Sequence, residues 1–185
     1  MKEYYSLDEL LNMIEEPNKS SCKKVYLINE VKFELAKGSE FKHQSWIGGY
    51  LDHIKEVMNI AVPLYEMLNS RRKQEFSLSD ALLVLYLHDL EKAWKYGGNE
   101  DEAYDALRFK NNYDFILYQA SKHDFKLTTE HLNALKYVHG EGSDYDKKRN
   151  VMGTLAGFVH ICDIASSRIW HEYPKKSGDT WATNE

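Results

Sequence analysis

Apolar residues along the chain recur mostly at spacings of three and four, which is the pattern of amphipathic helices. No segment shows the strict alternation of apolar and polar residues that is typical of a strand, and only three prolines and ten glycines interrupt the pattern. The sequence therefore predicts an all-α protein, with helices over residues 6–15, 23–36, 50–69, 77–96, 100–121, 129–138 and 150–172.

Two of the expected helices carry clear start signals. Ser6 is followed three positions later by Glu9, which is the capping-box arrangement, and Ser77 followed by Asp80 is a similar signal. The segment ALLVLYLHDLEKAW at 81–94 is almost continuously apolar and ends before a pair of glycines. Because a helix that is apolar on every side must be buried, we expect this one to lie at the centre of the domain.

The chain has the length of one ordinary domain, 185 residues, and its 43 % apolar and 29 % charged residues are the composition of a globular protein. We expect a helical domain over residues 1–173 and a polar tail over 174–185, in which Trp181 is suited to dock back on the domain. Cys22 and Cys162 have neither the number nor the spacing of a disulfide framework, so both should be reduced.

Charge and hydropathy limit the classes of molecule that the chain is expected to bind. The formal net charge of -5 argues against a broad basic face that grips duplex DNA, and small anionic partners fit it better. No stretch approaches the roughly 18 apolar residues that span a bilayer, and the acidic, amphipathic N-terminus does not resemble a signal peptide. We therefore expect a cytoplasmic protein that binds neither duplex DNA nor a membrane.

Four residues of metal-ligand type lie on apolar faces of three expected helices. His88 and Asp89 stand near the end of the most apolar helix, where an unpaired carboxylate would cost several kcal/mol unless a cation met it. His53 and Asp163 each lie four residues from a valine of their own helix, so both should face inward. We expect these helices to bring two imidazoles and two carboxylates to one divalent ion, for which manganese, iron, zinc, cobalt, nickel and magnesium are candidates.

Other histidines are given structural interpretations. A second His-Asp pair, His123 and Asp124, lies between two lysines near the end of an expected helix, and we interpret it as solvated surface. His131 and His171 are interpreted in the same way. His160 is expected in the core or in support of the site rather than as a ligand.

The order of a His, a His-Asp pair and a distant Asp resembles the HD-domain superfamily of metal-dependent phosphohydrolases. GGYLDHI at 48–54 looks like the glycine-rich opening of the first motif helix in a branch that includes bacterial 3′-5′ exoribonucleases with HD domains, and HDLEK at 88–92 is similar to the usual His-Asp-x-Gly-Lys. HGE at 139–141 and HICDIASSRI at 160–169 fall where this branch has a His-Gly and its last helix. The resemblance covers about residues 43–170 and implies a single helical bundle with a metal site between its helices.

The reaction that the resemblance implies is the attack of a metal-activated water on phosphorus. The metal ligands that it implies are His53, His88, Asp89 and Asp163. Glu91 stands where the family commonly has glycine, and residues 100–112 hold no clear histidine for a second metal. One metal ion is therefore expected.

The same resemblance offers roles for residues around the ligands. Lys92 is a candidate to hold a phosphate or the leaving group, with an exposed helix lysine as the alternative. His139, beside a glycine, is a candidate general acid, phosphate donor or additional ligand. Arg168 could bind phosphate, and His43 and Trp46 could stack on a base, although aromatic residues more often pack.

The function that the sequence predicts is hydrolysis of a phosphoester or phosphoanhydride bond in a nucleotide, as a nucleotidase, a triphosphohydrolase or a cyclic-nucleotide phosphodiesterase. A 3′-5′ exonuclease on single-stranded nucleic acid is the alternative among enzymes, and the acidic net charge counts against it. The alternative of another class is a regulatory module that binds metal or nucleotide without turnover. The variants His88→Ala and Asp89→Ala separate the two classes, because an enzyme would lose hydrolysis in them and a binding module shows no hydrolysis in the first place. A homo-oligomer is expected by analogy, because many small HD proteins dimerise.

Overall fold

The computed structural model describes residues 4–99 and 108–182, and within these ranges every regular element is helical, which confirms the predicted all-α class. None of the described helices is both long and apolar enough to cross a lipid bilayer. A 3₁₀ turn spans Gly142–Asp144, and a π-helical turn, Ala165–Ile169, follows the last helix. The helices are α1 (Leu7–Asn12), α2 (Asn18–Leu35), α3 (Gly49–Arg71), α4 (Leu78–Leu87), α5 (Glu91–Gly97), α7 (Asn112–Lys122), α8 (Thr129–Tyr137) and α9 (Thr154–Ile164).

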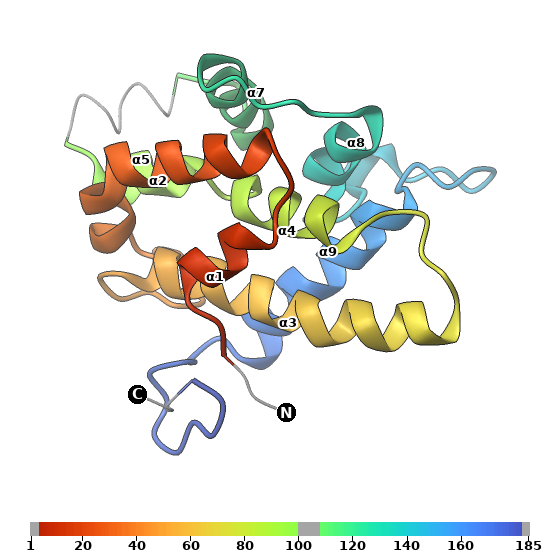
Figure 1. Ribbon diagram of the computed structural model, residues 1–185. Helices are drawn as coiled ribbons and strands as arrows, with labels where there is room; N and C mark the ends of the chain where they lie inside the picture. Colours follow the sequence, from red (N-terminus) through yellow and green to blue (C-terminus); the bar gives the residue numbers. More distant parts are fainter. Residues whose placement is uncertain (1–3, 100–107, 183–185) are drawn as a thin grey trace.

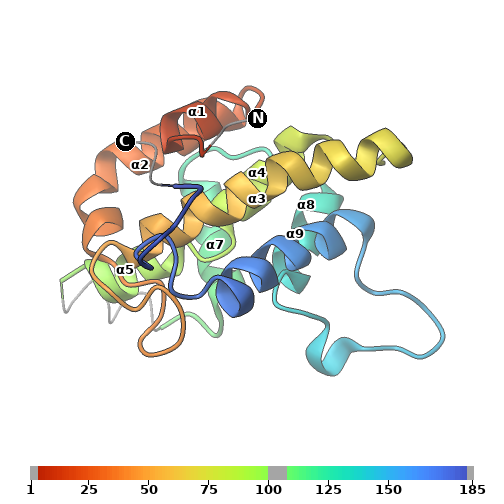
Figure 2. The same ribbon diagram turned by 90° about the horizontal axis from the view of Figure 1, so that it is seen from below.

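Helix α4 runs through the middle of the molecule, with α3, α8 and α9 packed around it (Figure 1). Its residues 81–87 are all buried, as expected for a helix that is apolar on every side. Ser77 begins it as predicted: its backbone N–H donates to the Asp80 carboxylate at 2.8 Å, and its hydroxyl oxygen accepts from the Asp80 backbone N–H at 3.1 Å. Helices α3 and α9 lie side by side along this core (Figure 2).

The apolar segment predicted as one helix over 77–96 is two helices with a break between them. His88 and Leu90 keep right-handed helical dihedrals, with φ -58°, ψ -30° and φ -57°, ψ -30°. The backbone hydrogen bonds nevertheless tighten to a three-residue spacing, as in the bond from the Leu90 N–H to the Leu87 carbonyl at 3.1 Å. Such a turn changes the direction in which side chains leave the backbone. The single-helix prediction is therefore wrong, and the break lies at His88 and Asp89.

The first two helices differ in how well their starts were predicted. Helix α1 begins with the predicted capping box, in which the Ser6 N–H donates to the Glu9 carboxylate at 2.8 Å and the Ser6 hydroxyl accepts from the Glu9 N–H at 3.3 Å. Helix α2 begins at Asn18, earlier than the predicted residue 23. It kinks at Asn29 (φ -128°, ψ 16°), whose side-chain amide donates to a backbone carbonyl one turn earlier at 3.0 Å. A side chain that bonds its own helix in this way often bends it.

The later helices are shorter than predicted. Helix α7 occupies the second half of the predicted helix over 100–121, and residues 100–107 lie outside the described residues. Helix α8 begins after Thr128, as expected. The last predicted helix, 150–172, is replaced by α9 and the π-helical turn after it. A π-helical turn often marks a functional position, and this one brings Ser166 against α3.

The C-terminal segment after Pro174 folds back onto the domain, on the side where the N-terminal segment also lies (Figure 1). Trp181 is partly buried, and its ring centroid lies 5.4 Å from that of Tyr4 and 5.5 Å from that of Trp170. The docking role predicted for Trp181 is confirmed.

Two histidines that the sequence placed on the surface are buried, His123 and His131. His131 Nε2 lies 2.9 Å from Oδ1 of Asp80, and its Nδ1 accepts from the backbone N–H at the start of α8 at 3.1 Å. His171 and Asp124 are exposed, as predicted. The apolar pattern along α8 could not reveal that His131 is buried, because the hydrogen-bond partner of His131 belongs to another helix.

Replacing His131 with alanine should lower the free energy of unfolding by about 1–2 kcal/mol, because α8 loses a cap and the Asp80 carboxylate loses a hydrogen-bond partner. Urea denaturation followed by circular dichroism measures the change. His171→Ala serves as the control, since that side chain is exposed. An equal loss of stability in the two variants would contradict the capping role of His131.

Candidate metal centre

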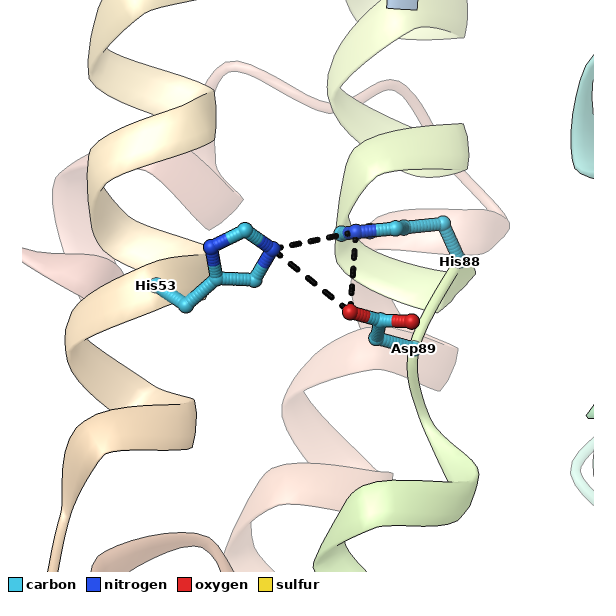
Figure 3. A group of neighbouring side chains, drawn as sticks. All are labelled: His53, His88 and Asp89. Atoms are coloured by element: carbon cyan, nitrogen blue, oxygen red, sulfur yellow. Dashed lines mark hydrogen bonds and ion pairs between the residues drawn. The ribbon is translucent and has the colours of Figure 1, made fainter. Parts of the chain in front are cut away.

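The four predicted metal ligands come from three places in the chain and meet in one buried cluster. His53 lies in α3, His88 and Asp89 lie at the break between α4 and α5, and Asp163 lies near the end of α9. All four residues are buried. Figure 3 shows His53 reaching from α3 across to His88 and Asp89. The structure thus brings together the residues that the sequence predicted to converge.

The candidate ligand atoms of the cluster lie close to one another. The Nε2 atoms of His53 and His88 are 3.3 Å apart. Oδ2 of Asp89 lies 3.5 Å from the first nitrogen and 3.3 Å from the second. Oδ1 of Asp163 lies 3.4 Å and 3.9 Å from them. Ligand atoms of His53, His88 and Asp89 all lie within 4.8 Å of one another, and so do those of His88, His139 and Asp163, so each set of three could hold a metal ion.

Hydrogen bonds on the far side of each imidazole determine which nitrogen carries hydrogen. Nδ1 of His88 lies 2.7 Å from the carbonyl oxygen of Leu85, which can only accept, so this Nδ1 donates. Nδ1 of His53 lies 3.1 Å from the hydroxyl of Ser166, whose own hydrogen goes to Glu56 at 2.8 Å, so this Nδ1 donates as well. The two neutral imidazoles therefore direct Nε2 lone pairs at each other. That arrangement is repulsive unless a proton or a metal ion lies between them.

Burial and charge set the protonation of the metal-free cluster. Burial lowers the pKa of His53 to about 4. Burial acts on His88 in the same direction, but the carboxylates of Asp89 and Asp163 outweigh it and raise the pKa of His88 to about 9. Burial would raise the pKa of Asp163, yet the neighbouring His53 and the charge of His88 lower it to about 2. In the metal-free protein, His88 therefore carries the positive charge that the two carboxylates require.

Two further predicted residues lie against Asp89. Nζ of Lys92 is 2.6 Å from Oδ2 of Asp89 and its side chain is 13 % exposed, so the alternative of an exposed helix lysine is wrong. Burial opposes the charge of Asp89, but Lys92 and His88 keep its pKa well below the usual range. Nε2 of His139 lies 3.3 Å from Oδ1 of Asp89 and 3.9 Å from Oδ2 of Asp163, with the side chain 47 % exposed. His139 thus stands at the mouth of the cluster.

A cavity of about 210 Å³ opens beside the cluster. Asp89, Asp163 and His139 reach it from the cluster itself. Its wall also includes three cationic side chains, Lys42, Lys92 and Arg168. Cations gathered beside carboxylate and imidazole ligands favour the binding of an anion next to a metal ion.

The two residues predicted to stack on a base are placed differently. His43 lines the cavity; its ring centroid lies 4.8 Å from that of His53, and its Nδ1 lies 2.7 Å from Oε1 of Gln44. Burial lowers the pKa of His43, so its ring is neutral. Trp46 is not among the residues of the cavity wall, and its indole N–H donates to Asp52 at 2.9 Å. The predicted stacking role therefore has a place in this cavity for His43 and not for Trp46.

The sequence did not single out the residues that hold His53 in position. Ser166 links His53 to Glu56, and the side-chain amide of Gln44 donates to the same Glu56 oxygen at 2.9 Å. Glu56 lies three residues after His53, and Ser166 lies three residues after Asp163. That helical spacing is the signal that could have found them. Gln44 lies in a loop with a left-handed φ of 39° and gave no comparable signal.

Replacing Ser166 with alanine should weaken metal binding by about 10–100-fold, because His53 loses the acceptor that fixes its tautomer and ring orientation. Isothermal titration calorimetry with Mn²⁺ measures the affinity. Ser167→Ala is the matched control, since Ser167 lines the cavity and no bond from it to His53 is seen. If the two variants bind Mn²⁺ equally well, Ser166 does not orient a ligand.

Comparison of the chain with protein-family models, with curated protein sequences and with solved structures gives no match. The resemblance to HD-domain proteins therefore stays a prediction from the sequence. Support for a function comes from the cluster, its cavity and their charges.

Proposed function

We propose that the chain is a metal-dependent phosphohydrolase of the HD-domain type that acts on a nucleotide. The observation that carries the proposal is the cluster itself, in which two imidazole lone pairs and two carboxylates converge beside a cavity with a cationic wall. The residues that would hold the ion are His53, His88, Asp89 and Asp163. A divalent ion bound there would supply Lewis acidity, which lowers the pKa of water and neutralises phosphoryl oxygens.

The cavity favours a phosphoryl group as the part of the substrate that enters. Its volume of about 210 Å³ is that of roughly seven water-sized groups, which is enough for a phosphoryl group and the first atoms of its ester. Arg168 offers a planar fork for two phosphoryl oxygens, and Lys42 offers a point charge. Lys92 is already paired with Asp89, so its main effect is to keep that carboxylate ionised. The neutral ring of His43 in the cavity wall would be available to stack against the remainder of the nucleotide.

His139 is the residue best placed to give a proton to the leaving oxygen. Burial would lower the pKa of His139, but its hydrogen bond to Asp89 raises it, which favours the imidazolium. Its segment is held by His160, whose Nδ1 lies 2.6 Å from the carbonyl oxygen of Val138. A partly exposed imidazolium beside the cavity can act as a general acid.

The experiment that tests the proposal is a screen for phosphate release and for cleavage products. Chelator-treated protein is supplied with Mn²⁺, Fe²⁺, Co²⁺, Ni²⁺, Zn²⁺ or Mg²⁺ and with nucleoside mono-, di- and triphosphates, cyclic nucleotides and short single-stranded oligonucleotides. We expect turnover of a nucleotide with at least one of the metals. Turnover of oligonucleotides alone would favour the exonuclease alternative.

The second His-Asp pair provides the matched control for this screen. Asp89→Asn should abolish the turnover. Asp124→Asn changes the exposed aspartate of the second His-Asp pair and should leave the turnover unchanged. No turnover of any substrate, from protein shown to be folded and loaded with metal, would contradict the proposal and favour a binding module.

A further inference from the structure

One ring nitrogen of His43, in the wall of the metal-centre cavity, is free for a ligand. The ring is partly buried, and its centroid lies 4.8 Å from that of His53. Nδ1 of His43 is engaged, at 2.7 Å from Oε1 of the buried Gln44. Nε2 has no hydrogen-bond or ion-pair partner within residues 4–99 and 108–182. What Nε2 can bind depends on which of the two nitrogens carries the hydrogen.

The orientation of the Gln44 amide is fixed by the acceptors around its nitrogen. Nε2 of Gln44 donates to Oε2 of Glu56 at 2.9 Å. It also lies 3.4 Å and 3.2 Å from the backbone carbonyl oxygens of Trp170 and Tyr173. Backbone carbonyl oxygens can only accept hydrogen bonds, so the NH₂ end of the amide must face them. The amide oxygen of Gln44 therefore faces His43.

This orientation determines the tautomer of His43. An amide oxygen can only accept, so Nδ1 of His43 carries the hydrogen and donates to Gln44. Burial, and after it the charge of Lys92, lowers the pKa of His43, so the ring is neutral and has no second hydrogen. A divalent ion in the adjacent cluster would act in the same direction as Lys92. Nε2 is therefore a fixed, uncharged acceptor in a cavity that also holds cations.

The charge of a phosphate decides what this acceptor can meet. Ionised phosphoryl oxygens accept hydrogen bonds and do not donate them, so they suit Lys42 and Arg168 and not Nε2 of His43. A ligand that displaces water from Nε2 without replacing its hydrogen bond loses about tenfold in affinity. We propose that Nε2 of His43 accepts a hydrogen bond from a sugar hydroxyl of the nucleotide and so determines specificity. The inference rests on the proposed function, because it takes the ligand to be a nucleotide.

The size of the cavity favours a sugar hydroxyl over a donor on the base. The volume of about 210 Å³ holds roughly seven water-sized groups, and a phosphoryl group with its ester oxygen takes about five of them. The donor that reaches His43 must therefore lie only a few bonds from phosphorus. In a nucleotide the nearest sugar hydroxyl is fewer bonds from phosphorus than any N–H group of the base. The face of the His43 ring remains free to stack while its edge accepts.

The test compares nucleotides that differ by one hydroxyl group. Adenosine 3′-monophosphate is paired with its 2′-deoxy analogue, and adenosine 5′-monophosphate is paired with its 3′-deoxy analogue. Each is titrated calorimetrically into the full chain in a chelator, so that binding is measured without hydrolysis. In at least one pair the nucleotide that has the hydroxyl should bind about tenfold or more tightly. Equal binding within both pairs, or no binding of any nucleotide up to about 10 mM by folded protein, would overturn the proposal.

Two variants separate the acceptor from the ring that carries it. His43→Phe keeps an aromatic face and removes Nε2, so it should lower the affinity ratio within the discriminating pair to about one. His171→Phe makes the same change at an exposed histidine outside the cavity wall and should leave the ratio unchanged. Circular dichroism establishes that each variant is folded. A ratio that survives in folded His43→Phe protein would contradict the proposal.

Hydrolysis rates distinguish a failure of this inference from a failure of the proposed function. Discrimination between the paired nucleotides by native protein that hydrolyses none of them would contradict the phosphohydrolase and leave the role of His43 standing. A lower rate of hydrolysis in His43→Phe protein with an unchanged affinity ratio would overturn the role of His43, because Nε2 would then contact the attacking water and not the sugar.

Discussion

Replacing Asp163 with asparagine is expected to reduce metal-dependent phosphate release by at least about a thousandfold, because the centre loses one of its two anionic ligands. Asparagine keeps the size of the side chain, so the fold should survive. Without the charge of Asp163, Asp89 is the one remaining carboxylate of the four candidate ligands that can balance a divalent ion. Asp89 is already paired with Lys92 at 2.6 Å. Initial rates at saturating metal and substrate measure the loss.

The same substitution at Asp124 is the control for the Asp163 variant. Asp124 is exposed and has a left-handed φ of 61°, which asparagine tolerates well, so Asp124→Asn should keep the rate within about twofold. Circular dichroism and the thermal midpoint of each variant establish that it is folded. Unchanged hydrolysis in folded Asp163→Asn protein would show that this residue does not hold the ion.

Removing the metal ion should lower the free energy of unfolding by about 4 kcal/mol relative to protein in free metal at about a thousand times the dissociation constant. The ligands come from three separate segments, so the unfolded chain cannot assemble them and does not bind the ion with comparable affinity. For a chain of this size the thermal midpoint should fall by roughly 10 °C. Differential scanning calorimetry before and after chelation, and again after reloading, measures the change. An unchanged midpoint in protein shown to bind metal would contradict ion binding by the folded cluster.

The gain in stability from the metal should shrink as the pH falls. In the metal-free protein Asp89 and Asp163 overcome the effect of burial and raise the pKa of His88 to about 9, so a proton must leave when the ion binds at neutral pH. The protonation of His88 stabilises the metal-free protein fully below the unfolded pKa of about 6.5, and this contribution is lost as the pH rises through about 9. Metal affinity should therefore rise by up to about tenfold per pH unit between about pH 7 and 9. Calorimetric titrations across that range test the slope, and a flat profile would contradict it.

Helical periodicity predicted that His53 and Asp163 face inward, because each of them lies on the apolar face of its own helix. His53 lies four residues before Val57, and Asp163 lies four residues after Val159. Both valines are buried, and the ligand side chains face the same interior. A polar residue on an apolar stripe is therefore informative when several helices carry one and the fold brings the stripes together.

The break between α4 and α5 could not be predicted from hydropathy, because the apolar pattern continues across it. Leu87, Leu90 and Ala93 are all buried, as they would be in one continuous helix. The turn is defined by the three-residue spacing of its backbone hydrogen bonds, which no side chain in the segment signals. The turn sets the direction in which the side chains of His88 and Asp89, two of the candidate ligands, leave the backbone.

Long-range partners account for the other differences between sequence and structure. His131 is buried because Asp80, 51 residues away, accepts its hydrogen bond. Gln44 is buried in a loop because it contacts Glu56 and Ser166 on two helical segments. Periodicity reports only on neighbours along one helix, so it could not find these contacts. Periodicity could not predict the cavity beside the cluster either, because its cationic residues come from separate segments of the chain.

The most direct test of the metal centre is anomalous diffraction from crystals of the protein soaked in Co²⁺ after chelation. We predict one strong anomalous peak per chain within about 2.0–2.3 Å of Nε2 of His53 and His88 and of a carboxylate oxygen of Asp89 and Asp163. The peak should be absent from crystals of Asp163→Asn protein and present in those of Asp124→Asn protein. A peak elsewhere, or none in the native protein at saturating Co²⁺, would contradict the assignment of these four residues as the ligands of one ion.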